Sequence, residues 1–176
     1  MADLEIVAFF PAVLVGGLST TAHTMTEAVH SWIEDPSTFE PWLGGDECPP
    51  PVVEELLRWR GPVMSFRRTA TVDHELRGQQ IRAGDKVLLS YASANRDERH
   101  FPDPDRFDIH RDIDRQLAFG YGAHFCIGAA LARMETRVAL AETLKRFPNY
   151  EVDESRLEFV HTATVRGYKS VPMRVR

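Results

Sequence analysis

Residues 119–128 read Phe-Gly-Tyr-Gly-Ala-His-Phe-Cys-Ile-Gly and place Cys126 near the end of a glycine-rich loop, called the Cys126 loop below. The run that follows from residue 129 is rich in Ala, Leu, Arg and Glu, which predicts a helix beginning directly after the cysteine. The free N–H groups and the dipole at a helix N-terminus favour an anionic sulfur. The glycines allow the loop to pass close to a flat, bulky group. A thiolate presented in this way is a metal ligand or a nucleophile.

The composition is that of a globular protein with an acidic balance. The 176 residues are 43% hydrophobic and 27% charged, which is enough for one domain with a core. The net charge of −5 argues against general nucleic-acid binding. Residues 1–57 contain ten acidic residues and no Lys or Arg, so all 21 basic residues lie in the remainder and could dock an acidic partner.

Cysteine usage and hydropathy predict a cytoplasmic protein without a membrane span. The two cysteines, Cys48 and Cys126, do not make a disulfide framework, which favours a reducing compartment. The apolar run from Ile6 to Leu18 is shorter than the roughly 20 residues that a spanning helix needs. It also contains Pro11 and follows acidic residues, unlike a signal peptide.

Periodicity predicts helices combined with short strands. We expect a long helix over residues 2–31, apolar nearly all round in its first half and therefore buried. The remaining predictions, in chain order, are a second helix over 27–34 or beyond Pro36, a rigid loop over 41–51, a helix from Pro49–Pro51 to Gly61, a small antiparallel sheet over 66–91, a short helix near 92–98, an irregular proline-stiffened loop over 101–112, a helix from Cys126 to Phe147, and two or three strands over 150–176.

Three local patterns give further expectations, and the first of them has two interpretations. Gly16, Gly17 and the following Ser and Thr residues either allow close helix packing or form a loosened turn that faces a ligand. Arg58 shares a helix face with both Glu54 and Glu55, and taken alone this pattern indicates a surface ion pair of little value. An apolar stripe on the last helix should face the core: Ile127, Leu131, Met134, Val138 and Ala141.

Four motifs in this order and spacing together resemble the soluble bacterial type of cytochrome P-450. They are Gly-Gly-Leu-Ser-Thr-Thr at 16–21, Glu-x-x-Arg at 55–58, Pro-Asp-Arg-Phe at 104–107 and the Cys126 loop. The resemblance implies a mainly α fold with small antiparallel β-sheets, the C-terminal part of the cytochrome P-450 fold. Residues 1–176 would form a single partial domain from the long distal helix to the C-terminus, with the N-terminal half absent.

The resemblance also implies a cofactor, haem b (iron protoporphyrin IX), bound through the Cys126 thiolate. A thiolate ligand favours O–O cleavage. Phe119, Gly120 and Gly128 would line the haem loop, and His124 and Arg68 match positions that bind the haem propionates, which are carboxylates suited to cationic donors.

Other motif positions imply structural and catalytic roles. Glu55, Arg58 and Arg106 would form a buried ion network behind the haem. Thr20 matches a threonine that helps to deliver protons during oxygen activation. Ser19 stands where the family commonly has an acidic residue, and a hydroxyl can relay a proton but cannot hold a carboxylate's charge.

Substrate and redox partner follow from the same resemblance. A hydrophobic small molecule would contact Gly17, Val63, Met64, Thr164 and Val165, although each of these residues could equally be ordinary core. Electrons would come from NAD(P)H through a ferredoxin-like or flavodoxin-like donor. Its docking face could include four arginines that are otherwise simply solvated: Arg111, Arg115, Arg133 and Arg137.

Three functions therefore stand at this point. The first is a haem-thiolate monooxygenase that hydroxylates or epoxidises a hydrophobic small molecule, present as a C-terminal fragment. The second is a catalytically inactive truncated remnant that binds haem weakly or not at all. The third is a hydrolase that uses Cys126 as its nucleophile, for which no residue is marked as a base. A zinc site has less support because the chain has only two cysteines.

Overall fold

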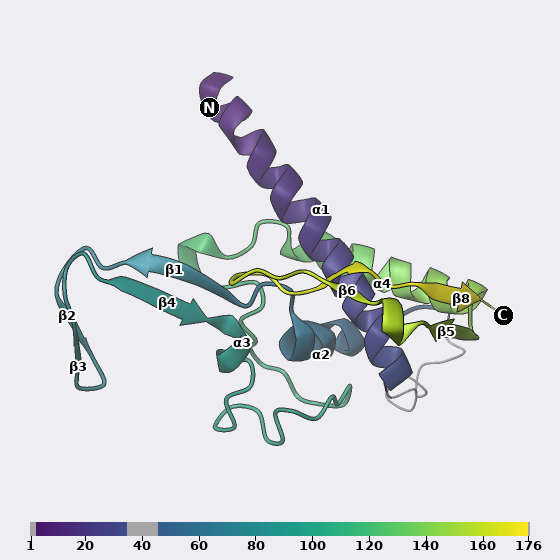
Figure 1. Ribbon diagram of the computed structural model, residues 1–176. Coiled ribbons are helices and arrows are strands. Elements are labelled where there is room, and N and C mark those ends of the chain that lie inside the picture. Colours follow the sequence, from purple (N-terminus) through teal and green to yellow (C-terminus); the bar gives the residue numbers. More distant parts are fainter. Residues whose placement is uncertain (1–2, 35–45, 176) are drawn as a thin grey trace.

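The computed structural model describes residues 3–34 and 46–175 (Figure 1). The helices are α1 (Asp3–Glu34), α2 (Pro50–Arg60), α3 (Tyr91–Ala94) and α4 (Ala129–Arg146), with short 3-10 turns η3 (Gly122–His124) and η4 (Glu154–Arg156). Residues 101–112 contain no regular helix or strand, as the prolines and aspartates predict, and the irregular backbone continues to residue 118. The predicted class, mainly α with small antiparallel sheets, is confirmed.

The described strands form four separate antiparallel pairs. They are β1 (Ser65–Thr69) with β4 (Lys86–Ser90), β2 (His74–Leu76) with β3 (Gln79–Ile81), β5 (Tyr150–Val152) with β8 (Met173–Val175), and β6 (Glu158–Phe159) with β7 (Tyr168–Ser170). The β-prone runs over 66–91 therefore make two ladders instead of one sheet. The tail contains four short strands where the sequence predicts two or three.

The core lies where the C-terminal part of α1 packs with α2 and α4 (Figure 1). Its fully buried members include Val52, Val53 and Leu56 from α2, which meet Trp32 and Leu140. The prediction of a second helix over 27–34 is wrong, because these residues continue α1 without a break. The part of that prediction beyond Pro36, and most of the predicted loop over 41–51, lie outside the described residues.

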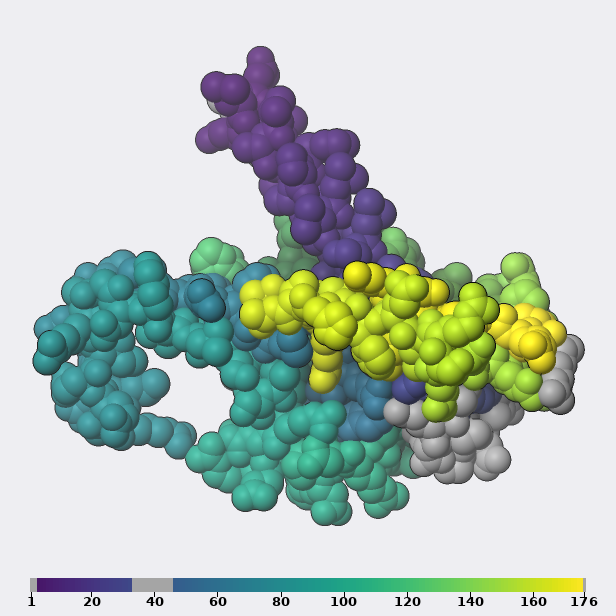
Figure 2. Space-filling model, viewed as in Figure 1, coloured from purple at the N-terminus to yellow at the C-terminus, as the bar shows by residue number. Residues whose placement is uncertain are grey.

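The N-terminal half of α1 projects from the body of the molecule (Figure 2). Every residue from Asp3 to Ser19 is exposed, so the predicted burial of this half is wrong. Its apolar side chains are exposed, from 83% at Leu4 to 41% at Leu14. By length and composition alone, Asp3–Trp32 could cross a membrane, since it contains a window of mean hydropathy 1.6. The absence of a membrane span stays a prediction, because the core helix of a soluble protein meets the same criterion.

The apolar stripe on α4 also faces outward. Ile127 is 90% exposed, and Leu131, Met134 and Val138 are exposed as well, so the predicted burial is wrong for these four residues. Ala141, the fifth residue of the stripe, is half-buried and packs against the core as predicted. The buried positions of α4 lie on another face: Ala129, Thr136, Leu140 and Leu144. Two apolar surfaces, on α1 and α4, are thus left uncovered by the described residues. Exposed apolar area of this kind marks a site of interaction.

Candidate functional site around Cys126

The backbone of the Cys126 loop is fixed by glycine conformation and by hydrogen bonds. Gly120 and Gly122 have φ angles of +72° and +74°, which residues with a side chain adopt only with strain. The Cys126 N–H donates to the Phe119 carbonyl at 3.0 Å, and the Ala129 N–H donates to the Cys126 carbonyl at 3.2 Å. The loop therefore closes on itself and leads directly into α4, as the sequence predicts.

The Cys126 thiol is exposed and has apolar surroundings. Phe125 and Ile127 on either side are both exposed, and a Cβ added at Gly128 would lie 3.9 Å from the Cys126 sulfur. His124 is exposed in the same loop. An accessible sulfur set in apolar surface can bind a metal whose other ligands come from a flat organic group.

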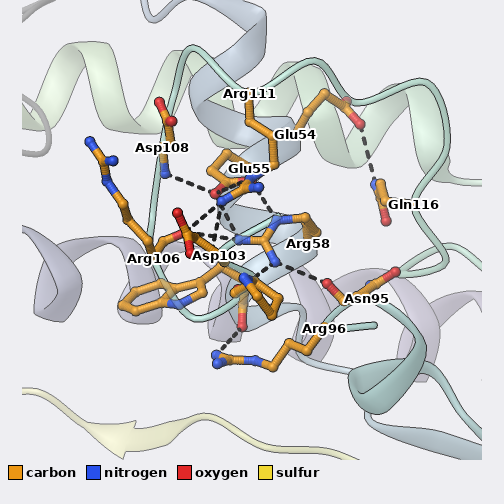
Figure 3. Close-up of polar contacts among 12 residues, drawn as sticks. Glu54, Glu55, Arg58, Asn95, Arg96, Asp103, Arg106, Asp108, Arg111 and Gln116 are labelled. Carbon is orange, nitrogen blue, oxygen red and sulfur yellow. Dashed lines mark hydrogen bonds and ion pairs between the residues drawn. The ribbon is translucent and has the colours of Figure 1, made fainter. Parts of the chain in front are cut away.

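Behind the loop, α2 carries a fully buried ion pair (Figure 3). Arg58 donates from Nε to Glu55 Oε2 at 2.6 Å and from Nη2 to Glu55 Oε1 at 2.7 Å, and both side chains are 0% exposed. Arg58 also donates to the backbone carbonyls of Asn95, Pro104 and Arg106. The interpretation of a surface pair is wrong, because the pair ties α2 to the irregular segment around residue 105.

Arg106 enters this network by its backbone and not by its side chain. Its guanidinium is exposed, whereas its carbonyl accepts hydrogen bonds from Arg58 and Arg111. The second buried guanidinium belongs to Arg111, whose Nε lies 3.2 Å from Glu55 Oε1. Asp108 completes the set by donating its backbone N–H to the same oxygen at 2.8 Å (Figure 3). The prediction for the Arg106 side chain is therefore corrected to Arg111, five residues later on the same loop.

The four arginines proposed as a docking face are mostly engaged within the chain. Arg111 binds Glu55, Arg133 forms an ion pair with Glu54, and Arg137 donates to the Cys48 carbonyl at 2.8 Å. Arg115 instead lies over the exposed ring of Tyr121, 5.0 Å from its centroid. A cavity of about 340 Å³ opens here, lined by residues that include Glu54, Asp114, Arg115, Gln116, Tyr121 and Arg133.

On α1, the hydroxyl groups bond back to the helix. Ser19 Oγ donates to the Val15 carbonyl at 3.0 Å, and Thr20 Oγ1 donates to the Gly16 carbonyl. The helix nevertheless stays continuous, so the turn is not loosened. No described atom lies within 4 Å of a Cβ added at Gly16 or Gly17, so these glycines do not serve close packing between described helices.

The predicted substrate contacts come together in part. Val63 and Val165 form an antiparallel bridge, and the Met64 N–H donates to the Thr164 carbonyl at 2.8 Å. Two segments a hundred residues apart in the chain therefore meet side by side. Gly17 lies apart from this bridge in sequence, on the exposed half of α1.

Arg68 and His124, the predicted propionate contacts, retain free cationic or polar groups. Arg68 is half-buried on β1, and its Nη1 donates to the neighbouring Arg67 carbonyl at 2.9 Å. Within residues 3–34 and 46–175, neither Arg68 nor His124 forms an ion pair. Both can therefore receive an anionic group from outside the described chain.

Comparisons with known proteins give a consistent result. The cytochrome P450 family model matches residues 50–162. The methyl-branched lipid omega-hydroxylase of Mycobacterium tuberculosis is 42% identical, with 98% of this chain and 41% of the relative covered. Cytochrome P450-terp of a Pseudomonas species is 40% identical, with 98% and 40% covered.

Solved structures extend the match to three dimensions. CYP109E1 of Bacillus megaterium, in complex with testosterone, is 36% identical with a TM-score of 0.93, and 99% of this chain covers 49% of it. CYP109B1 of Bacillus subtilis is 38% identical with a TM-score of 0.92. The chain thus spans less than half the length of these relatives. On the family match, the identities and the shared fold, the chain belongs to the cytochrome P450 family.

Proposed function

We propose that this chain is the C-terminal portion of a haem-thiolate monooxygenase and that Cys126 supplies the sulfur ligand of haem b. The observation that carries the proposal is the exposed Cys126 thiol, held by a self-bonded glycine loop at the start of α4. The chain would contribute one thiolate to the iron, and the porphyrin would supply its nitrogen ligands. Family membership supports haem as the group concerned.

The residues near the thiol fit such a cofactor. Exposed Phe125 and Ile127 offer apolar contact to a porphyrin, and Arg68 and His124 can bind its two carboxylates. When bound, a thiolate-ligated haem supplies the activation of oxygen. On α1, the Thr20 hydroxyl donates to the Gly16 carbonyl, which fixes its orientation. Its oxygen lone pairs are then available to accept a hydrogen bond from a water molecule.

Ser19 limits how protons can be delivered along α1. Its hydroxyl donates to the Val15 carbonyl at 3.0 Å, as the Thr20 hydroxyl does to the Gly16 carbonyl, but it cannot hold the negative charge of a carboxylate. Proton delivery then depends on Thr20 with water or substrate, so slower turnover than in an enzyme with a carboxylate at this position is expected. Peroxide-driven chemistry, which needs fewer delivered protons, is the other consequence.

The size of the chain and its exposed surfaces support a partial domain. Solved relatives are about twice as long, and the apolar surfaces of α1 and α4 face outward here. We therefore propose that residues 1–176 are one partial domain and that the N-terminal half of the P450 fold would cover these surfaces. For residues 1–176 taken alone, the same exposed surfaces favour a second candidate function, an inactive remnant, because a haem bound beside Cys126 would be held weakly.

The structure supports a chemical class of substrate and of redox partner. The bridge that joins Val63 to Val165 presents apolar residues, which suits a hydrophobic small molecule. Electrons from NAD(P)H would arrive through a ferredoxin-like or flavodoxin-like donor. Arg115 is the arginine best placed to meet it, since Arg111, Arg133 and Arg137 are engaged within the chain. A cytoplasmic location agrees with two free cysteines and with the bacterial relatives.

The carbon monoxide difference spectrum of the reduced, hemin-loaded chain tests the proposal. We expect a thiolate-type Soret band that disappears in Cys126→Ser. Failure of the wild-type chain to retain haem would contradict the proposal for residues 1–176 and favour the remnant. Haem retention without product, when a ferredoxin and its reductase are supplied, would also favour the remnant. Inhibition of an esterase activity by thiol alkylation would point to the hydrolase.

A further inference from the structure

Three consecutive residues lead into the Cys126 loop, and side chains hold the backbone N–H groups of two of them. The Leu117 N–H donates to Asn95 Oδ1 at 2.6 Å, and the Ala118 N–H donates to Gln116 Oε1 at 2.6 Å. Asn95 is itself tied to α2, because its carbonyl accepts from Arg58. The buried Glu55–Arg58 pair is thus connected to Leu117 through Asn95. Gln116, which binds the Ala118 N–H, must be held by a different residue.

Glu54 provides that support. Gln116 Nε2 donates to Glu54 Oε2 at 3.2 Å (Figure 3). An amide that donates through its nitrogen has its oxygen fixed on the opposite side, where it accepts from Ala118. Glu54 therefore orients Gln116, and Gln116 holds the backbone of Ala118.

A second contact runs from Glu54 to the next residue of the loop. Arg133 of α4 binds both Glu54 oxygens, by an ion pair from Nε to Oε1 and by a hydrogen bond from Nη2 to Oε2 at 3.1 Å. The guanidinium of Arg133 lies over the Phe119 ring, 4.5 Å from its centroid. A bidentate ion pair of this kind fixes the plane of the guanidinium, and a guanidinium fixed in this way can hold the Phe119 ring by cation–π attraction.

Both branches converge on the residue that bonds Cys126. Phe119 follows Ala118, and its carbonyl accepts the Cys126 N–H at 3.0 Å. We propose that Glu54 is a positioning residue for Cys126: it holds Phe119 from its backbone side through Gln116 and from its ring side through Arg133. Glu55, one residue later, holds the segment around residue 105 instead. The catalytic meaning of this arrangement rests on the proposed function, in which Cys126 binds haem iron.

Amide hydrogen exchange of the full chain, followed by NMR without haem, tests the inference. In Glu54→Gln we expect the Ala118 and Cys126 amides to exchange about tenfold faster, which corresponds to losing one charge-assisted hydrogen bond. The amide of Leu140, in the core of α4, should be unchanged. Glu142→Gln is the matched control, because it removes an exposed ion pair to Arg146 on the same helix.

Gln116→Leu is the second variant, since it removes the Ala118 branch and leaves the pair between Glu54 and Arg133 in place. It should accelerate Ala118 exchange even if Glu54→Gln fails to fold. Wild-type exchange of Ala118 and Cys126 in both variants would overturn the inference. Equal acceleration at Ala118, Cys126 and Leu140 would also overturn it, because the role of Glu54 would then be general stability.

Loading the same variants with hemin separates this inference from the proposed function. A positioning role predicts a smaller thiolate-type Soret band in Glu54→Gln than in Glu142→Gln at equal haem content. If the wild-type chain shows no thiolate band, the proposed function fails, and the exchange result still decides whether Glu54 holds the loop. A full thiolate band in Glu54→Gln, with haem bound, would overturn the positioning of Cys126.

Discussion

Glu55→Ala removes the acceptor of the fully buried ion pair on α2. Glu55 accepts from two nitrogens of Arg58, from Arg111 Nε and from the backbone N–H of Asp108. The variant leaves the Arg58 guanidinium buried, with three carbonyl oxygens as hydrogen-bond acceptors and the Phe101 ring 5.3 Å away, but without a carboxylate to balance its charge. It also releases the segment that Asp108 and Arg111 anchor to α2.

The expected cost follows from burial. Breaking a buried pair by removing one partner costs about 3–5 kcal/mol, because an uncompensated charge stays in the interior. A domain of ordinary stability has about 5–15 kcal/mol to lose, so much of the free energy of unfolding should disappear. With a typical dependence of about 2 kcal/mol per M urea, the midpoint should fall by about 2 M.

Urea unfolding followed by circular dichroism measures this change, with Glu142→Gln as the control. Glu142 and its partner Arg146 are 49% and 69% exposed, so their ion pair should contribute at most about 1 kcal/mol. Equal midpoints for Glu55→Ala and Glu142→Gln would refute the view that the buried pair fixes the segment around residue 105.

Other residues give predictions of defined sign. Iodoacetamide at pH 8 should label exposed Cys126 and spare Cys48, because burial raises the pKa of the Cys48 thiol to about 12. Peptide mass spectrometry measures the labelling, and modification of both cysteines in the folded chain would contradict the burial of Cys48. Because an unfolded cysteine loses its proton at about pH 8.5, the native state holds more protons between that pH and 12, and stability should fall as pH rises, less so in Cys48→Ala. Gly122→Ala should lower the free energy of unfolding by about 1–2 kcal/mol, because the φ angle of Gly122 is +74°. Gly17→Ala should raise it by about 0.5–1 kcal/mol, because Gly17 lies within a helix and has open space around it. Urea midpoints that move in the same direction in the two variants would contradict this pair of predictions. Tyr150→Phe should cost about 1 kcal/mol, measured in the same way, because its hydroxyl donates to a carbonyl of α1.

Glycine and proline positions and helix propensity predict the elements whose structure depends on residues close by in the sequence. The Cys126 loop, the helix after it and the helix that ends at Gly61 follow from glycine, proline and helix propensity, and the structure has all three. The spacing of Glu55 and Arg58 places both on one face of α2. Neither spacing nor composition tells that this face is fully buried, since burial depends on a loop that lies some fifty residues further on.

The remaining differences come from long-range packing. Apolar periodicity marks the surfaces of α1 and α4 that need a cover, but it does not say whether residues of the same chain supply one. Arg111 takes the place expected for the Arg106 side chain because the loop turns its backbone carbonyl inward at residue 106. The pair between Glu54 and Arg133 joins residues 79 apart, and no local pattern marks it.

X-ray absorption at the iron edge of the hemin-loaded chain shows directly which protein atom binds the haem iron. We expect a sulfur atom in the first coordination shell of the wild-type chain and its loss in Cys126→Ser, with the Cys48→Ala spectrum unchanged. A first shell of nitrogen and oxygen alone in the wild-type chain, or a sulfur that persists in Cys126→Ser, would show that Cys126 is not the iron ligand.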